Sequence, residues 1–121
     1  KMQASDLAIL CNLQHEHIVK VHGISSVREI EPYVVLDKMT CNLAGKIREW
    51  GVKGRHSNLR ERLCIFHALA SALDLIHEKR ILYRGLDPCT VGFDGNGTVK
   101  LFDFSVAKRL TDDSSSFLLT I

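Results

Sequence analysis

The sequence predicts an α+β fold in one small domain, and three observations support this. Two stretches carry apolar residues at helical spacing, and short runs rich in β-branched residues lie between and after them. Residues 94–97 read Asp-Gly-Asn-Gly between two such runs, which is a strong local signal for a β-hairpin. The 121 residues are enough for one hydrophobic core and few for two.

Two shorter helices are expected in the first half of the chain. Residues 6–14 place leucines at three-residue steps, which indicates the back half of an amphipathic helix. Residues 43–50 form a short helix, and residues 51–58, which are rich in Gly, Lys and Arg, form a loop after it.

The longest predicted helix spans residues 59–77 and begins after Ser57 or Asn58, either of which can cap it. Its apolar face recurs at steps of 4, 3, 4, 3 and 4 residues, at Leu59, Leu63, Phe66, Ala70, Leu73 and His77. This stripe is widened by Ile65, Leu69 and Ile76. We therefore expect the helix to be buried on more than one side.

Short strands surround these helices. Residues 18–22 form a strand that Gly23 ends, and residues 33–36 form a second one, so the two pair as an antiparallel hairpin. Residues 91–93 and 99–101 flank the Asp-Gly-Asn-Gly turn. A calcium loop starting at residue 94 is the alternative, but its twelfth position needs a bidentate glutamate and holds a serine. We prefer the hairpin.

The composition of the chain limits the partners and the cellular compartment that are expected for it. A net charge of +2 gives no reason to expect nucleic acid or an anionic membrane as a partner, and no apolar run approaches the roughly 20 residues of a membrane span. Residues 1–7 lack the apolar core of a signal peptide. Four widely spaced cysteines indicate free thiols in a reducing compartment, so an intracellular and cytoplasmic location is expected.

Three closely spaced histidines raise the question of a metal site. His15, His17 and His22 lie within eight positions, but no acidic or thiol residue joins them at regular ligand spacing. A turn that is rich in histidine is the preferred interpretation.

Residues 81–108 carry the strongest functional signal. One segment reads Tyr83-Arg84-Gly85-Leu86-Asp87-Pro88-Cys89-Thr90. A second, beyond the predicted hairpin, reads Lys100-Leu101-Phe102-Asp103-Phe104-Ser105-Val106-Ala107-Lys108, with Asp103 thirteen residues after Thr90. Together they resemble the catalytic loop and the magnesium-binding Asp-Phe-Gly segment of protein kinases. The resemblance implies a partial protein-kinase-like fold with ATP and Mg²⁺ as its cofactors.

The resemblance extends toward the N-terminus with less specific residues. Residues 9–19 are similar to the end of helix C and the strand after it, which places Asp6 at the position of the helix-C glutamate. Residues 33–39 are similar to the strand and hinge that bind adenine. The implied organisation is a small-lobe remnant at 1–36, a hinge, long helix and both loops at 37–110, and the start of an activation segment at 111–121.

The resemblance also implies which residues would bind a nucleotide and its metal ion. The implied nucleotide-binding residues are Leu36, Asp37, Met39 and Gly92, and the implied metal ligand is Asp103. Gly92 falls where a larger apolar residue usually floors the adenine pocket, so it leaves room there but removes contact area. Asp103 has a structural alternative as a turn carboxylate that accepts from nearby N–H groups. The glycine-rich loop and its lysine would precede Lys1, and the Ala-Pro-Glu segment would follow Ile121, so the resemblance covers a truncated domain.

The catalytic loop departs from the family pattern at three positions. Gly85 replaces the aspartate that accepts the substrate's hydroxyl proton, and general-base catalysis is typically worth about 10²–10⁴-fold. Thr90 replaces the asparagine that helps to hold the second Mg²⁺, and Asp87 replaces a phosphate-attracting lysine with an anion. Asp87 could substitute for the lost base from two positions away. Ser105 replaces the usual glycine and favours a locked segment.

Other matches are structural or regulatory. The family's regulatory spine corresponds to Leu10, Val21, Tyr83 and Phe104, for which core packing and function coincide. Arg84 matches the catalytic-loop arginine that, in this family, pairs with a phosphorylated activation segment. Possible phosphate acceptors in the polar tail are Thr111, Ser114, Ser115, Ser116 and Thr120.

The leading hypothesis is a pseudokinase that binds ATP weakly or not at all and acts through protein partners. The first alternative is an active serine/threonine-type protein kinase seen as a truncated sequence. The second is a non-enzymatic interaction domain or an unstable gene remnant, since the apolar face of the 59–77 helix would stay uncovered.

Overall fold

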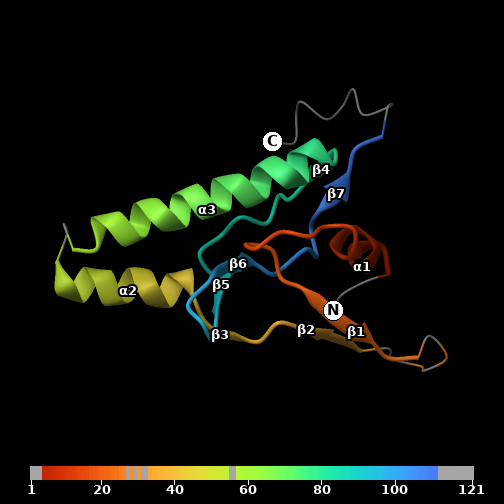
Figure 1. The fold of residues 1–121 in the computed structure, drawn as a ribbon, viewed down its shortest axis with the longest axis horizontal. Helices are drawn as coiled ribbons and strands as arrows, with labels where there is room; N and C mark the ends of the chain where they lie inside the picture. The colour runs from red at the N-terminus through yellow and green to blue at the C-terminus, as the bar shows by residue number, and fades with distance from the viewer. Residues whose placement is uncertain (1–3, 27, 29, 31–32, 55–56, 112–121) are drawn as a thin grey trace.

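The computed structural model describes residues 4–26, 28, 30, 33–54 and 57–111, and this part of the chain contains helices and short strands in a mixed order (Figure 1). The helices are α1 (Ala4–Cys11), α2 (Leu43–Lys53) and α3 (Leu59–Glu78). The strands are β1 (Val21–Ile24), β2 (Val34–Leu36), β3 (Met39–Asn42), β4 (Ile81–Leu82), β5 (Val91–Asp94), β6 (Val99–Leu101) and β7 (Lys108–Arg109). The mixture confirms the predicted α+β class.

The strands form three small antiparallel sheets. β1 pairs with β2, which confirms the first predicted hairpin, and β4 pairs with β7. The third sheet has the order β3-β5-β6, and its β5–β6 hairpin confirms the second. In that hairpin's turn, Asp94 Oδ1 accepts from the N–H groups of Asn96 and Thr98 at 2.9 Å each, and Gly97 has a φ of +79°. The Asp94 carboxylate is therefore part of the turn, as the hairpin interpretation requires.

The strand predicted at residues 18–22 is wrong in its bounds. Ile18 forms a parallel bridge with Leu101, and the Val19 N–H donates to the Leu101 carbonyl at 2.9 Å, so this part joins β6. β1 begins only at Val21 and continues through Gly23, which pairs with Val35 after a shift in register. Gly23 therefore does not end the strand.

Other element bounds also differ from the prediction. α1 ends at Cys11, because Asn12 and Leu13 donate to carbonyls three residues back and tighten the last turn. α2 continues to Lys53, into the predicted loop. β3 and β7 were not predicted, since their sequences lack an apolar alternation and their partners, β5 and β4, are distant in sequence.

α3 buries one face and exposes another. Its buried residues are Ile65, Ala68, Leu69, Ala72 and Ile76. Leu59, Leu63 and Phe66 are 62%, 58% and 65% exposed, so the expectation of burial on more than one side is wrong for the described chain. The predicted side-chain cap is also wrong: Asn58 is the N-cap residue but has a left-handed backbone (φ 57°) and makes no capping hydrogen bond. The Ser57 hydroxyl instead donates to the Gly54 carbonyl at 2.7 Å.

α2 and α3 lie side by side, and the central sheet, β3-β5-β6, lies between α2 and α1 in Figure 1. Glu61 of α3 joins the two helices by accepting from Lys46 Nζ at 2.9 Å and from Trp50 Nε1 at 3.3 Å. One cluster of buried apolar side chains runs from α1 through the strands to the inner face of α3. The core therefore holds the segments around residues 83 and 104 from both sides.

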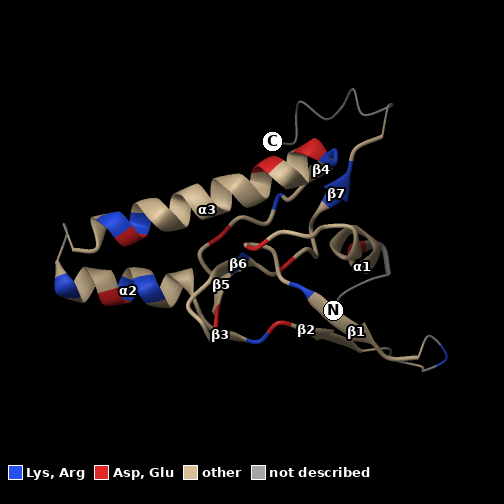
Figure 2. Ribbon diagram, viewed as in Figure 1, with Lys and Arg blue, Asp and Glu red and all other residues tan. Residues whose placement is uncertain are grey.

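A half-buried ion-pair network joins β1, the segment after β2, and β6. Asp37 Oδ2 accepts from Lys100 Nζ at 2.8 Å and from the Lys20 N–H at 2.9 Å, and Asp37 Oδ1 lies 2.6 Å from His22 Nε2. Burial by itself would raise the pKa of the Asp37 carboxyl, but the hydrogen bonds from Lys100, Lys20 and His22 hold it well below its usual range. In Figure 2 a basic position lies just before β1, and an acidic and a basic position lie between β2 and β3.

Asp37→Asn is expected to lower the free energy of unfolding by about 2–4 kcal/mol at pH 7, because it leaves the Lys100 charge largely buried without a counter-charge. A depressed carboxyl pKa contributes stability that is present above the unfolded value near 4 and is lost as the pH falls toward the folded value. The gap between wild type and variant should therefore narrow below about pH 4. Urea unfolding of the full chain at pH 7 and pH 3 measures both quantities.

Glu49→Gln is the matched control. Glu49 pairs with Lys53 at 3.0 Å with both side chains 56% exposed, so its loss should cost less than about 1 kcal/mol. An equal loss for Asp37→Asn at both pH values would contradict the assignment.

Candidate functional site

The segments that resemble the two kinase loops meet in the core. β4 leads into residues 83–90, the β5–β6 hairpin follows, and residues 102–105 return beside the first segment. Tyr83 and Phe104 pack edge to face, with ring centroids 5.1 Å apart at an interplanar angle of 69°. Both side chains are almost fully buried, so this contact fixes one loop against the other.

The predicted spine residues belong to this same core. Leu10 of α1 is 1% exposed, and Val21 of β1 is partly buried against the cluster that contains Tyr83 and Phe104. Asp6, in the first turn of α1, is also buried. The geometry thus links α1 to both loops through apolar packing.

Tyr83 serves this core as a neutral side chain. Its hydroxyl is buried and makes no hydrogen bond within the described residues, and the nearby Thr90 hydroxyl donates to the Gly85 carbonyl. Burial raises the pKa of Tyr83 to about 12. Tyr83 therefore cannot act as a base near neutral pH.

Gly85 occupies the position of the missing proton acceptor. A Cβ built there would lie 3.0 Å from Val106 Cγ2 and 3.7 Å from the Asp103 and Tyr83 carbonyl oxygens. The position therefore faces the metal-loop segment, but it carries no side chain. Val106 is 47% exposed, so it has freedom to move if a side chain is introduced.

Asp87 and Thr90 use their polar groups inside the loop. Asp87 Oδ1 accepts from the Cys89 N–H at 2.8 Å, and the Asp87 carbonyl accepts from the Thr90 N–H at 2.9 Å. Thr90 Oγ1 accepts from the Asp87 N–H at 3.1 Å while it bonds to the Gly85 carbonyl. This pattern is a self-contained turn.

Arg84 is exposed and has a left-handed backbone, with a φ of 56°. Its Nε donates to the Val106 carbonyl at 2.8 Å, so the guanidinium holds the segment that follows Phe104. Thr111 is exposed at the end of the described chain. The other predicted phosphate acceptors lie outside the described residues: Ser114, Ser115, Ser116 and Thr120.

The Asp103 side chain acts as a turn carboxylate, which was the structural alternative predicted for it. Its Oδ1 accepts from the Ser105 N–H at 3.0 Å. Hydrogen bonding to Ser105 lowers the pKa of the Asp103 carboxyl, although partial burial opposes this, so the group is ionised at neutral pH. An ionised, half-exposed carboxylate has the charge and hardness that Mg²⁺ prefers.

The residues expected to bind a nucleotide lie close to one another, but contacts within the protein already occupy them. A Cβ at Gly92 would come within 2.7 Å of Met39 Sδ and 3.0 Å of Phe102 Cδ1. The expectation that Gly92 leaves room is therefore wrong, because these two side chains fill the space. Leu36 packs against the core, and the Asp37 carboxylate lies in its ion-pair network.

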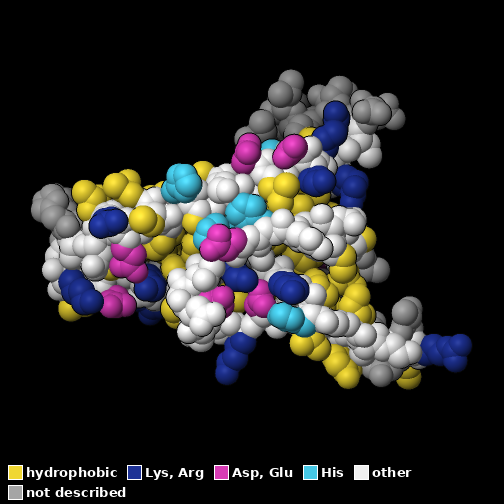
Figure 3. Space-filling view, viewed as in Figure 1, with side chains coloured by type: hydrophobic (Ala, Val, Ile, Leu, Met, Phe, Trp, Pro, Cys, Tyr) yellow, Lys and Arg dark blue, Asp and Glu magenta, His cyan; other side chains and the backbone are white. Residues whose placement is uncertain are grey.

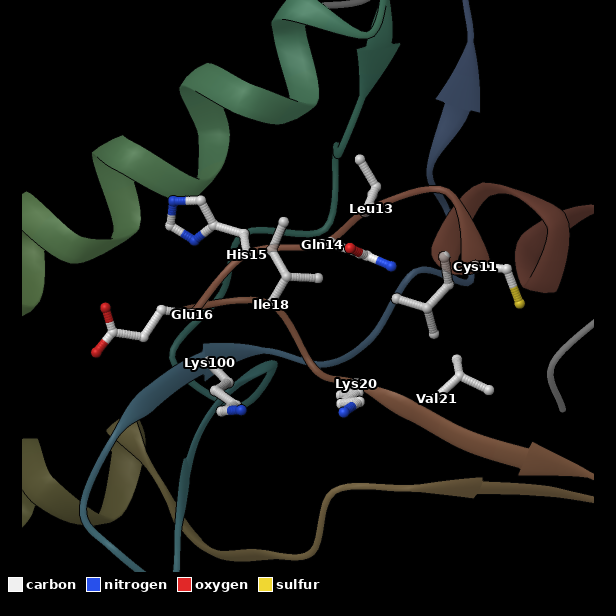
Figure 4. Close-up of a pocket in the computed structure, with 10 residues that line it drawn as sticks. Cys11, Leu13, Gln14, His15, Glu16, Ile18, Lys20, Val21 and Lys100 are labelled. Carbon is white, nitrogen blue, oxygen red and sulfur yellow. The ribbon is translucent and has the colours of Figure 1, made fainter.

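A cavity of about 480 Å³ lies beside the candidate site, between α1, residues 12–20, β1 and β6 (Figure 4). In this view Lys20 and Lys100 lie below Ile18, and His15 and Glu16 lie to its left. No residue of the 83–90 loop lines it. The sequence carried no signal for this cavity, because the fold of residues 10–21 shapes most of its wall and Lys100, distant in the chain, completes it.

The three histidines have separate roles. His15 bonds to Ser71 of α3 at 3.0 Å, and its Nδ1 accepts from the His17 N–H at the same distance. Burial, with a smaller effect from His17, lowers the pKa of His15. His22 contacts Asp37 instead. Within the described ranges, no three His, Cys, Asp or Glu side chains are grouped to hold a metal ion.

This arrangement of a helix linked through a buried stack to two neighbouring loops, with a hairpin between them, is that of the central part of a protein kinase. A family model described as protein kinase domain matches residues 1–121. The chain therefore belongs to the protein kinase family.

Several curated proteins are similar to this chain. A probable serine/threonine-protein kinase of Arabidopsis thaliana is 29% identical over 108 residues, covering 88% of this chain and 18% of the relative. Mitogen-activated protein kinase 15 of Rattus norvegicus is 30% identical, covering 81% and 17%. Probable serine/threonine-protein kinase PknB of Lactococcus lactis is 33% identical, covering 87% and 16%. The chain thus spans less than a fifth of the length of these relatives.

None of the described helices combines the length and the apolar character that crossing a bilayer would need.

Gly92→Ala is expected to destabilise the chain by about 1–3 kcal/mol, because the new methyl group overlaps the Met39 and Phe102 side chains in a packed region. Gly23→Ala is the control: a Cβ there meets nothing within 4 Å, so its effect should stay within about 0.5 kcal/mol. Thermal or urea unfolding of the full chain measures both. A Gly92→Ala variant as stable as Gly23→Ala would show that the space beside Gly92 is open.

Proposed function

We propose that this chain is the central part of a pseudokinase, which binds ATP weakly or not at all and acts through contacts with protein partners inside the cell. The observation that supports this most directly is the catalytic loop. The position of the proton acceptor is Gly85, and the nearest polar side chains, Asp87 and Thr90, are hydrogen-bonded within the loop itself.

Rescue of the missing base by Asp87 would have an energetic cost. The carboxylate would have to release the Cys89 N–H and turn toward a substrate from two positions along the chain. Losing a charge-assisted hydrogen bond of this kind costs about 1–3 kcal/mol. The loss of general-base catalysis itself raises the barrier by roughly 3–5 kcal/mol.

The contacts around the nucleotide-binding positions support weak binding of ATP. Met39 and Phe102 occupy the space above Gly92, and the Asp37 carboxylate is neutralised by Lys100. Asp103 would hold Mg²⁺ if a nucleotide complex formed, and the metal would supply charge neutralisation for the phosphates. The anionic Asp87, in place of a lysine, would weaken phosphate binding in that loop.

The second candidate is an active serine/threonine-type protein kinase. Its support is the similarity to proteins named as serine/threonine-protein kinases, together with the ionised Asp103 and the retained Arg84. In that case Asp87 would take the role of the base.

Phosphate transfer from radiolabelled ATP to a mixed protein substrate separates the two candidates. The natural full-length protein is expected to transfer no more label than its Asp103→Asn variant, which lacks the metal ligand in either case. Gly85→Asp with Thr90→Asn restores the family's loop residues and should raise transfer at least about tenfold if the rest of the site is complete. Transfer by the unaltered protein well above the Asp103→Asn background would overturn the pseudokinase proposal.

A further inference from the structure

His15 connects residues 12–20, the segment between α1 and β1, to α3. Its Nε2 lies 3.0 Å from the Ser71 hydroxyl of α3, and its Nδ1 accepts from the His17 N–H at 3.0 Å. In Figure 4 the His15 ring points from this segment toward α3. Figure 3 shows histidine side chains at the surface where the segment comes close to α3. Both ring nitrogens of His15 therefore have a partner, one on each side of the junction.

These two contacts require one particular protonation state of the His15 ring. A backbone N–H can only donate, so Nδ1 must carry a lone pair and no proton. Nε2 then carries the single proton of the neutral ring and donates it to the Ser71 hydroxyl. A protonated ring donates from both nitrogens and cannot accept from the His17 N–H. Protonation therefore replaces a hydrogen bond with two N–H groups that face each other.

The contacts of the two neighbouring histidines do not have this requirement. His17 Nδ1 lies 2.9 Å from the Val99 carbonyl oxygen, and His22 Nε2 lies 2.6 Å from Asp37 Oδ1. Because carbonyl and carboxylate oxygens accept, these ring nitrogens donate whether the ring is neutral or protonated. Among these three described histidines, the dependence on an unprotonated nitrogen belongs to His15.

The titratable and charged groups around His15 come from its own segment, from β6, and from α3 within one turn of Ser71: Glu16, His17, Lys20, Lys100, His67 and Asp74. Lys20 and Lys100 line the same cavity as His15, and the ring centroid of His17 lies 5.6 Å from that of His15. Burial, followed by the neighbouring His17, lowers the pKa of His15 against a weaker opposing effect of Glu16. The closed junction therefore disfavours the protonated ring.

From this geometry we propose that His15 makes the junction between residues 12–20 and α3 acid-sensitive: a ring that takes up a proton turns away from the His17 N–H and releases Ser71. A histidine whose pKa is lowered in the folded state contributes stability that is present above its ordinary value near 6.5 and is lost as the pH falls below it. The junction is therefore closed at neutral pH and opens in mild acid. Because residues 12–20 lead directly out of α1, opening weakens the link between α1 and α3.

Nitrogen-15 NMR of the histidine rings tests the geometry in the natural full-length protein, labelled at histidine alone. The His15 signals are identified by their loss in His15→Asn. At pH 7.5 they are expected to show a protonated Nε2 and an unprotonated Nδ1. A proton on Nδ1 at that pH would overturn the proposal, whatever the variants do.

Hydrogen exchange of the peptide that contains residues 12–20, corrected for the intrinsic effect of pH, tests the acid response. Between pH 7.5 and pH 5.5 the protection of the wild type is expected to fall about three- to tenfold. About tenfold is the limit for one group that has a pKa near 6.5 in the open state and stays unprotonated in the closed state. His15→Asn should respond less than about twofold, because an amide oxygen at this position can accept from the His17 N–H and does not titrate.

Two further variants complete the experiment. His67→Asn is the matched control, since it removes an exposed histidine of α3 and leaves both His15 contacts in place, so it should keep the full acid response. Ser71→Ala removes the partner on α3 and should lower the protection at pH 7.5 about two- to tenfold, as expected for one neutral hydrogen bond. Circular dichroism at pH 7.5 verifies that all variants are folded.

Three results of the exchange experiment would overturn the proposal. The first is a wild type whose protection does not change with pH, and the second is an acid response in His15→Asn as large as that of the wild type. The third is a Ser71→Ala variant as protected as the wild type at pH 7.5.

Discussion

The edge-to-face contact between Tyr83 and Phe104 is the constraint on which the rest of the structure depends. It joins two loops that are separated in sequence by the β5–β6 hairpin, and it sits in a core built from α1, α3 and the central sheet. Because both rings are buried, the backbone on either side of each ring has little freedom. The positions of Gly85 and Asp103 follow from this packing, whether or not they carry chemistry.

Within this rigid frame, the polar groups that a kinase would use for catalysis have internal partners. Thr90 and Asp87 close the loop on itself, Arg84 holds the Val106 carbonyl, and Asp103 holds the Ser105 N–H. Each of these bonds stabilises the native loop by about 0.5–3 kcal/mol, and each would have to be broken or shared for metal or substrate binding. The loop therefore has the properties of a structural element.

Local patterns in the sequence predicted much of this arrangement. The Asp-Gly-Asn-Gly turn, the long helix and the two loop motifs were all recognisable, because their signals depend on neighbouring residues. Strands β3 and β7, the filling of the Gly92 site by Met39, and the Asp37 network were missed, since each depends on residues distant in the chain. The exposed face of α3 was misjudged because an apolar period shows that a face is suited to burial, and not what covers it.

Calorimetric titration of Mg²⁺-ATP into the natural full-length protein tests the central claim most directly, since every kinase needs this complex before any transfer. The account predicts no saturable binding with a Kd below about 1 mM, equivalent to a binding free energy weaker than about −4 kcal/mol. Saturable binding with a Kd of about 10 μM, lost on Asp103→Asn substitution, would contradict it.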